Sequence, residues 1–250
     1  MRNPQCPRTE KSAVCVLRCA HCSVEHLPWP RTLQRSNECR TNHAGPTRRI
    51  RPWKLASETV TLDHLSNGRV ILSVGVGAID TGFDAFGEVT DRKTRAELLD
   101  EELDILTGLW RGQPFSYEGK HYRITAPDFK PPPRPVQQPR IPIWVVGMWP
   151  RMKSMRRVAK YDGLLPTVQG REVTPDDICE MTAFGESHRA LASPFDVVME
   201  GRTPGDDPRQ AAAIIRPWEE AGATWWIESR WDEAPDVVLT RLRQGPPRLG

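Results

Sequence analysis

The sequence predicts an α/β fold in which parallel strands alternate with helices. Strand-like and helix-like segments alternate four times in the second half of the chain, beginning at Ile141, with short turns between them. Such alternation indicates parallel strands that are joined by right-handed crossovers. The segment RVILSVGVG adds a nearly continuous β-branched run, which is typical of a strand buried on both faces. Two architectures satisfy this pattern, an open doubly wound sheet and a (β/α) barrel.

The first half of the chain contributes two helices, one strand and a hairpin. The segment KLASETVTLDHLS predicts a helix that ends at SNG and carries a stripe of Leu55, Thr59, Leu62 and Leu65. After the strand and a glycine-punctuated loop, the segment DRKTRAELLDEELDILTGLW predicts the strongest helix, with a stripe of Leu99, Leu103, Leu106 and Trp110. FSYEGKHYRI predicts a hairpin around Glu118-Gly119. Seven prolines between residues 127 and 142 then predict an extended loop.

The second half contains the four strand–helix pairs. IPIWVVG precedes RMKSMRRVAKY, DGLLPTV precedes TPDDICEMTAFGESHRA, PFDVVMEG precedes DDPRQAAAIIRPWEEAG, and ATWWIES precedes APDVVLTRLRQG. Each pair has the length of one βα unit, so we expect the strands of this half to lie side by side and parallel.

Composition and charge exclude several classes of protein. The 250 residues are 38% hydrophobic and 27% charged, which is a globular balance, and no apolar run approaches the roughly 18 residues of a membrane span. The early apolar cluster AVCVL is too short for a signal peptide, so we expect a cytoplasmic protein. Residues 1–51 carry ten Lys and Arg against three Glu, a net +7, and the remaining residues carry 25 against 29, a net −4. This division argues against a uniformly basic nucleic-acid-binding protein.

Five of the six cysteines lie in the same basic leader, and two metal sites are alternatives there. Cys15, Cys19 and Cys22 have the C-x3-C-x2-C spacing of a three-cysteine iron–sulfur cluster, whereas Cys19, Cys22, Cys39 and His43 could close a tetrahedral zinc site. The flanking sequence shows neither strand alternation nor a helical stripe. We therefore expect residues 1–47 to be an atypical, poorly ordered leader without a metal.

Beyond the leader, the sequence resembles a known family. The resemblance rests on RPWKLASETVTLDHLSNGRVILSVGVG, TDRKTRAELLDEELDILTGLWRGQPFSYEGKHYRI, RPVQQPRIPIWVVGMWP, PFDVVMEGRTPGDDP and EEAGATWWIE. These blocks are similar to the luciferase-like flavin- or deazaflavin-dependent oxidoreductases over about residues 48–250. The resemblance implies a (β/α)8 TIM barrel, which takes roughly 250 residues, so the 47-residue leader is too short for three units.

The barrel implied by the resemblance is incomplete at its N-terminus. Its fourth to eighth strands would be Val70–Gly77, Ile141–Gly147, Gly163–Val168, Phe195–Glu200 and Ala223–Glu228, and its first three strands are not recognisable. We expect that the reading frame begins wrongly, or that the gene has lost its start and gained unrelated coding sequence.

The same resemblance implies the chemistry. A reduced cofactor, either FMN with oxygen or the deazaflavin coenzyme F420, would act on a small organic substrate at the C-terminal mouth of the barrel. A flavin reductase and a second copy of the chain are further expected partners, and neither nucleic acid nor a membrane is expected. The alternatives are a non-catalytic, truncated remnant of such an enzyme and a metal-binding leader fused to it.

Two stretches that match the family would line the cofactor. At Gly75, Val76 and Gly77 the missing side chains would let a ring approach the backbone, although the same pattern also suits a tight exit turn. Val146, Gly147, Met148 and Trp149 precede a helix with Arg151 and Lys153, whose free N–H groups would suit a phosphate. The alternative for this helix is a solvated basic face. Family members often carry Gly-Gly-Arg where this chain has Val-Gly-Met.

Other polar or aromatic residues are weaker candidates, and the catalytic residues stay unknown. His64 lies beside Asp63 but the match suggests a packing role, and we expect His121 and His188 at the surface. We expect Trp225 and Trp226 on opposite faces of the last strand and both in the core. Glu228, at the exit of that strand, could face the mouth of the barrel.

Overall fold

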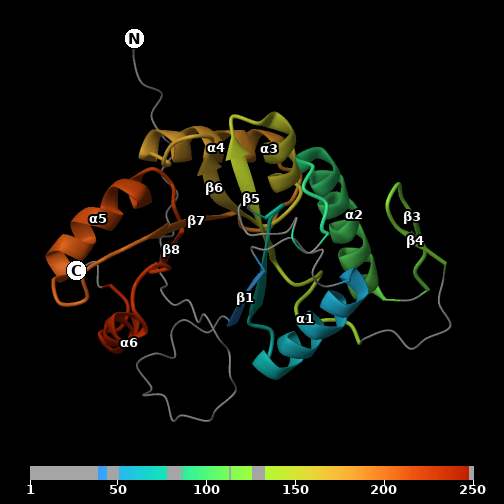
Figure 1. The fold of residues 1–250 in the computed structure, drawn as a ribbon, viewed down its shortest axis with the longest axis horizontal. Helices are drawn as coiled ribbons and strands as arrows, with labels where there is room; N and C mark the ends of the chain where they lie inside the picture. Colours follow the sequence, from blue (N-terminus) through green and yellow to red (C-terminus); the bar gives the residue numbers. More distant parts are fainter. Residues whose placement is uncertain are drawn as a thin grey trace. The chain divides into compact units, whose positions relative to one another are not determined.

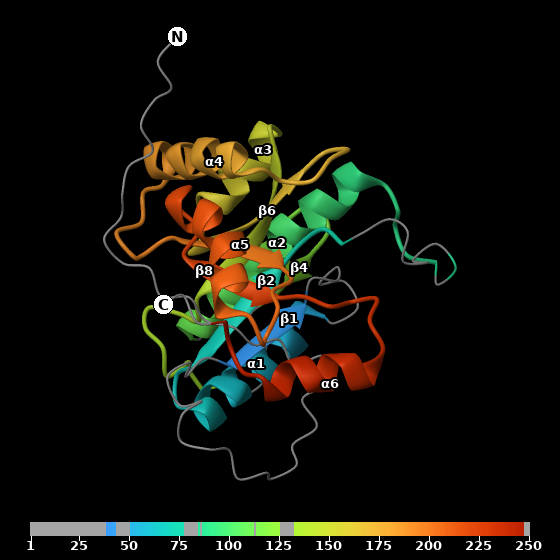
Figure 2. The ribbon, with the colours of Figure 1, turned by 90° about the vertical axis from the view of Figure 1, so that its left-hand side faces the viewer.

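A computed structural model describes residues 39–43, 51–77, 85, 87–112, 114–125 and 133–247, and for residues 39–43 it describes the backbone alone. The chain divides into two compact units, one formed by Glu38–Val146 and the other, among the described residues, by the chain from Gly147 onward. Figures 1 and 2 label the elements of both units. Within the described part, no helix is long and apolar enough to cross a membrane.

The first unit contains parallel strands and two long helices. Its elements are β1 (Cys39–His43), α1 (Pro52–Ser66), β2 (Val70–Val74), α2 (Arg92–Arg111), the hairpin strands β3 (Tyr117–Glu118) and β4 (Arg123–Ile124), and the beginning of β5 (Ile143–Trp149). β1 pairs in parallel with β2, and β2 pairs in parallel with β5, with Leu72 opposite Ile143. The β-branched run therefore forms a strand between two neighbours and is buried along its whole length, as predicted.

Strand β1 is a difference from the sequence analysis, which placed no strand before Pro52. The segment CRTNH has one β-branched residue and no apolar alternation, so its sequence gives no strand signal. Its extended backbone follows from pairing with β2, with Cys39 opposite Val70 and His43 opposite Val74. Tertiary pairing here decides a conformation that local propensity does not predict.

The two long helices pack through apolar residues that the patterns identify only in part. All four predicted stripe residues of α2 are buried, and the Trp110 Nε1–H reaches the Ala56 carbonyl at 3.4 Å. In α1 the predicted stripe is wrong at its end, because Leu65 is 78% exposed. The buried residues near this end are Asp63 and Ser66, which take polar contacts that a hydrophobic pattern does not register.

The second unit repeats one strand and one helix in order. Its elements are the end of β5, α3 (Met152–Val158), β6 (Gly163–Val168), α4 (Pro175–His188), β7 (Asp196–Gly201), α5 (Pro208–Glu220), β8 (Trp225–Glu228) and α6 (Pro235–Arg243). β6 pairs in parallel with β7, and β7 pairs in parallel with β8. The five strands expected from the resemblance all form, each within a few residues of its expected ends.

The α/β class is therefore confirmed, and the strands within each unit are parallel. The described residues contain six such strands, fewer than the eight of a closed barrel, so the complete (β/α)8 barrel stays a prediction. Helices α3 and α4 lie side by side in both views (Figures 1 and 2). They define one face of the strands of the second unit, and the candidate site lies on the other face.

Candidate functional site

The turn after β2 is fixed by packing and by a buried arginine. A Cβ atom on Gly75 would lie 2.9 Å from Val146 Cγ2, so the close approach of β5 requires glycine there. Gly77 has φ +75°, a conformation that favours glycine. Arg95 of α2 donates from Nη2 to the Val76 carbonyl, and burial lowers the pKa of this guanidinium. The structure thus brings Gly75 and Val146 together. Close packing explains the glycine at position 75, and the positive φ explains the glycine at position 77.

Gly147 is buried between β5, β6 and α3. A Cβ atom there would lie 2.5 Å from Leu164 Cδ1 and 3.0 Å from Val158 Cγ2. The space beside Gly147 is therefore occupied by core side chains rather than left for a ligand. The same packing shows that Gly147 of β5 and Leu164 of β6 face α3. It therefore identifies which face of these two strands is directed toward α3.

The start of α3 presents backbone donors that no side chain of the described residues caps. The Met148 N–H donates to Ser154 Oγ at 3.0 Å, and the Arg151 N–H donates to the Met148 carbonyl at 2.9 Å. These bonds fold the loop back against the start of α3. Among the described residues no side chain caps α3, whereas Thr174 caps α4 and Asp207 caps α5. The first N–H groups of α3 therefore lack the acceptor that the next two helices have.

Basic side chains stand beside these donors. Arg151 and Lys153 are both exposed, and the Arg151 Nε donates to Gln169 Oε1 at 3.1 Å, a neutral acceptor after β6. The Trp149 indole lies toward α4, where its Nε1–H donates to Glu180 Oε2 at 2.9 Å. Uncapped N–H groups and two cations form a local arrangement that suits a phosphate.

The strand register identifies the face opposite α3. Leu164 is paired with Val197, so Val197 also faces α3, and strand alternation turns Val198 and Glu200 the other way. Thr167 lies on that opposite face too, where its hydroxyl is 3.7 Å from the sulfur of Met148. We call this face of the second unit the inner face, and its residues are Met148, Leu165, Thr167, Val198, Glu200, Trp225 and Ile227.

On β6 and β7 the exposure of inner-face side chains rises toward the carboxyl ends, whereas on β8 Trp225 is half-buried and Ile227 is buried. Leu165 and Val198 are buried, Met148 and Thr167 are half-buried, and Glu200 is exposed. The carboxyl ends of parallel strands are where α/β folds place their sites. The candidate site is therefore this end of the inner face together with the start of α3.

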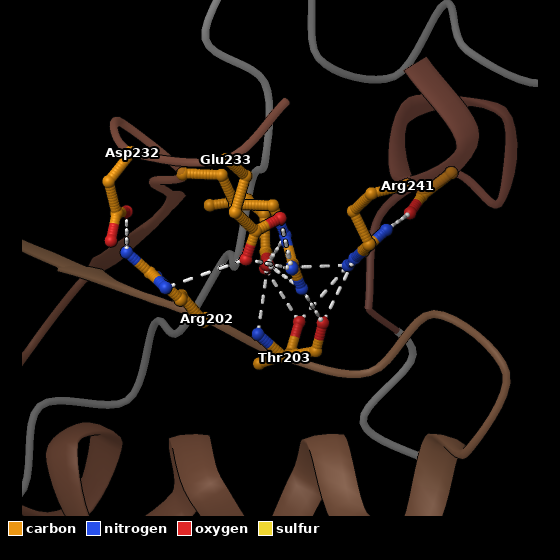
Figure 3. A network of polar contacts seen from close by, with 8 residues as sticks. Arg202, Thr203, Asp232, Glu233 and Arg241 are labelled. Atoms are coloured by element: carbon orange, nitrogen blue, oxygen red, sulfur yellow. Dashed lines mark hydrogen bonds and ion pairs between the residues drawn. The ribbon is translucent and has the colours of Figure 1, made fainter. Parts of the chain in front are cut away.

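Glu228 does not face this site. It is paired with Gly201, which lies on the α3 side of the strands, and its side chain is 8% exposed. Its carboxylate accepts from the Thr203 N–H at 2.9 Å and the Thr203 hydroxyl at 2.6 Å. It also accepts from Arg230 Nε at 3.1 Å and Arg241 Nη2 at 3.4 Å (Figure 3). With four donors the carboxylate is saturated, which makes it a structural anchor rather than an acid or base.

The arginines around Glu228 have further carboxylate partners. Arg230 donates from Nη1 to both oxygens of Glu233 at 2.8 Å. Burial lowers the pKa of Arg230, but the hydrogen bond to Glu233 and the charge of Glu228 outweigh it, so the pKa is raised. Arg202, at the end of β7, pairs with Asp232 and Glu233 (Figure 3). These pairs tie the loop after β7 to the loop after β8.

The histidines of the sequence analysis have structural partners. Asp63 is fully buried and accepts from the backbone N–H and side-chain amide of Gln137, and His64 Nε2 lies 2.9 Å from the Arg134 carbonyl. Both residues therefore anchor the proline-rich segment to α1, and they do not act as a pair.

The other two histidines differ in exposure. The side chain of His121 is 18% exposed and contacts Glu97 at 3.1 Å, so its predicted surface position is only partly right. His188 is exposed, as predicted, and stacks on Phe184.

The tryptophans of β8 alternate as predicted. Trp226 is buried and packs against Gly201 on the α3 side, and Trp225 is half-buried on the inner face.

The sequence analysis missed Ser154, Thr167, Arg95 and Glu200. Thr167 and Glu200 could have been found as the last inner-face residues of their strands, once one residue of each strand had been oriented. The metal alternatives remain untested, because Cys15, Cys19 and Cys22 lie outside the described residues and Cys39 and His43 are described as backbone alone. Within the described residues, no three metal-binding side chains gather.

Comparison with known proteins gives consistent matches. The family model for luciferase-like monooxygenases matches residues 45–236. An F420-dependent glucose-6-phosphate dehydrogenase of Rhodococcus hoagii is 27% identical over 240 residues, covering 80% of this chain and 68% of the relative. The oxygenase component of a flavin-dependent trigonelline monooxygenase of Acinetobacter baylyi is 30% identical over 99 residues, covering 40% of this chain and 27% of the relative.

Solved structures agree on the fold. The coenzyme F420-dependent tetrahydromethanopterin reductase of Methanopyrus kandleri has a TM-score of 0.56 at 18% identity, covering 72% of this chain and 74% of that one. The monooxygenase RslO1 of Streptomyces bottropensis has a TM-score of 0.53 at 18% identity, covering 72% of this chain and 66% of that one. The matches thus cover about two thirds to three quarters of these two structures and of the Rhodococcus relative, and 27% of the trigonelline oxygenase component.

Proposed function

The chain belongs to the luciferase-like monooxygenase family, and from this premise we propose that it is an oxidoreductase that binds reduced FMN or the deazaflavin coenzyme F420. One relative that matches the chain is named for F420 and another for a flavin, so both cofactors remain part of the proposal. The proposed substrate is a small organic molecule. If the cofactor is FMN, a separate reductase supplies its reduced form, as the name of the trigonelline oxygenase component suggests.

The observation that carries this proposal is the uncapped start of α3 beside Arg151 and Lys153. FMN and coenzyme F420 both carry a phosphate on a side chain attached to a three-ring system, and N–H groups at a helix start bind phosphate. Ser154 Oγ accepts from the Met148 N–H, which holds the loop in place and leaves the hydroxyl proton able to donate to a ligand. The backbone N–H groups and the two cations are the proposed phosphate ligands, and the Ser154 hydroxyl can add a further donor.

The inner face supplies the remaining surface for the cofactor. Met148 and Thr167 lie next to the proposed phosphate ligands, and the Thr167 hydroxyl is held by the Gly147 carbonyl at 2.9 Å. In the first unit, Arg95 fixes the turn of Gly75, Val76 and Gly77 through the Val76 carbonyl. The bound cofactor would supply either a hydride or activated oxygen, according to which of the two it is. The protein groups orient it and keep the loops rigid.

An absorbance and fluorescence titration with FMN and with coenzyme F420 tests this function. We expect saturable binding of one of them at micromolar concentration, which also identifies the branch of the family. Circular dichroism of the same sample establishes that the protein is folded. A folded, soluble protein that binds neither cofactor would contradict the proposal and favour a non-catalytic remnant.

A further inference from the structure

Among the described residues of the inner face, Glu200 carries the one acidic group. Glu200 is the last inner-face residue of β7, and it is exposed although Val198, two residues earlier, is buried. No hydrogen bond or ion pair from another described residue reaches it. The register of β6 and β7 pairs Leu164 with Val197, so strand alternation places Thr167 and Glu200 on the same face, each near the carboxyl end of its strand. Glu200 therefore shares the inner face with the surface proposed for the cofactor.

In the polar network of Figure 3, each arginine is paired with a carboxylate. These arginines come from the loops after β7 and β8 and from α6. The pairs are Arg202 with Asp232 and Glu233, Arg230 with Glu228 and Glu233, and Arg241 with Glu228. Three cations thus face three carboxylates, and Glu200 is an additional negative charge. Among the described residues of this network, no arginine lacks a carboxylate partner.

The two ends of the site consequently differ in charge. The start of α3 offers Arg151 and Lys153 without carboxylate partners among the described residues, whereas the end of β7 offers Glu200. An anion is attracted to the first and repelled by the second. A bound cofactor whose phosphate lies at α3 would leave the Glu200 end to the substrate.

We infer that Glu200 contacts the substrate and selects neutral or cationic hydrogen-bond donors, such as hydroxyl and amine groups, over phosphorylated or carboxylated molecules. This inference rests on the proposed function. A carboxylate accepts hydrogen bonds from such donors more strongly than a neutral acceptor does. The ordinary alternative is a solvated carboxylate that touches no ligand, and the following experiment separates the two.

The experiment uses the cofactor-loaded protein and matched pairs of small molecules that differ in charge. The pairs are glucose with glucose 6-phosphate, glycerol with glycerol 3-phosphate, and benzylamine with benzoate, and binding is measured by calorimetry. We expect the neutral or cationic member to bind more tightly. We expect Glu200→Gln to weaken that binding about tenfold to hundredfold, the effect of losing a charge-assisted hydrogen bond. Cofactor affinity should not change.

A second measurement does not depend on the substrate. Iodide and neutral acrylamide quench the fluorescence of the bound cofactor by collision, and a nearby carboxylate repels only iodide. At low ionic strength we expect Glu200→Gln to raise iodide quenching about twofold and leave acrylamide quenching unchanged. Glu186→Gln, an exposed carboxylate on α4, is the matched control and should change neither.

The outcomes are distinct. A wild-type protein that binds no cofactor refutes the proposed function itself. The role of Glu200 is refuted if the cofactor-loaded protein prefers the anionic members of the pairs or binds no member of any pair. It is also refuted if iodide quenches the bound cofactor equally in the wild type and in Glu200→Gln.

Discussion

Replacing Glu228 tests the polar network of Figure 3 most severely. The Glu228 carboxylate accepts four hydrogen bonds and is 8% exposed, and the Arg241 side chain is 6% exposed. In Glu228→Gln an NH2 group replaces one carboxylate oxygen and cannot accept hydrogen bonds. Buried donors of Thr203 or of the arginines therefore lose their acceptor. An unsatisfied buried donor costs about 1–3 kcal/mol, and breaking a buried ion pair costs about 3–5 kcal/mol. We therefore expect Glu228→Gln to lower the free energy of unfolding by about 3 kcal/mol.

The assay is urea denaturation followed by circular dichroism, with thermal unfolding as a second measure. For a chain of this size about 3 kcal/mol corresponds to a fall in Tm of about 6–12 °C. Asp232→Asn is the control, because its side chain is 73% exposed and a surface pair contributes less than about 1 kcal/mol. If Glu228→Gln unfolds within about 1 kcal/mol of the wild type, the carboxylate does not anchor the network, and the structural role assigned to it is wrong.

Three further substitutions probe other parts of the fold. Gly147→Ala should lower the free energy of unfolding by about 1–3 kcal/mol in urea, because its Cβ would overlap Leu164, and an unchanged value would contradict the packing. The hydrogen bond from Arg171 is the main cause that lowers the pKa of Asp177, so its stabilisation is present above the unfolded pKa of about 3.9 and is lost at lower pH. Asp177→Asn should flatten the fall in stability below about pH 4, and an unaltered pH profile would refute this. Glu101→Gln should speed hydrogen exchange in the β3–β4 hairpin, whose N–H groups donate to this carboxylate, and unchanged exchange would exclude that anchor.

Strand positions were predictable because their local patterns are strong. The run Val70–Val74 is β-branched and buried throughout, and the strands from Ile143 onward are separated by helical segments with clear starts. Strand β1 was not predictable, since its five residues carry no apolar alternation and take their conformation from β2. The exposure of Leu65 was missed for a related reason, because Asp63 is buried by polar contacts that no hydrophobic pattern contains.

The candidate site was predictable only where it follows the chain locally. The loop from Val146 to Trp149 precedes its helix in sequence, so its position at the start of α3 could be predicted. The direction of Glu228 could not, because it depends on its register with Gly201, a strand and a helix away. Glu200 was overlooked for the same reason, since alternation says which residues share a face but not which face holds the site.

The central claim is that the start of α3 binds the cofactor phosphate, and a comparison of FMN with riboflavin tests it most directly. The two ligands share the ring system and differ in the phosphate. We expect the Arg151→Gln/Lys153→Gln variant to bind FMN about tenfold more weakly than the wild type, with riboflavin affinity unchanged. The control variant Arg156→Gln/Lys160→Gln removes the same charge from exposed positions beyond the first turn of α3 and should bind both ligands as the wild type does. Equal FMN affinity in the first variant and the wild type, or equal loss with riboflavin, would contradict the claim.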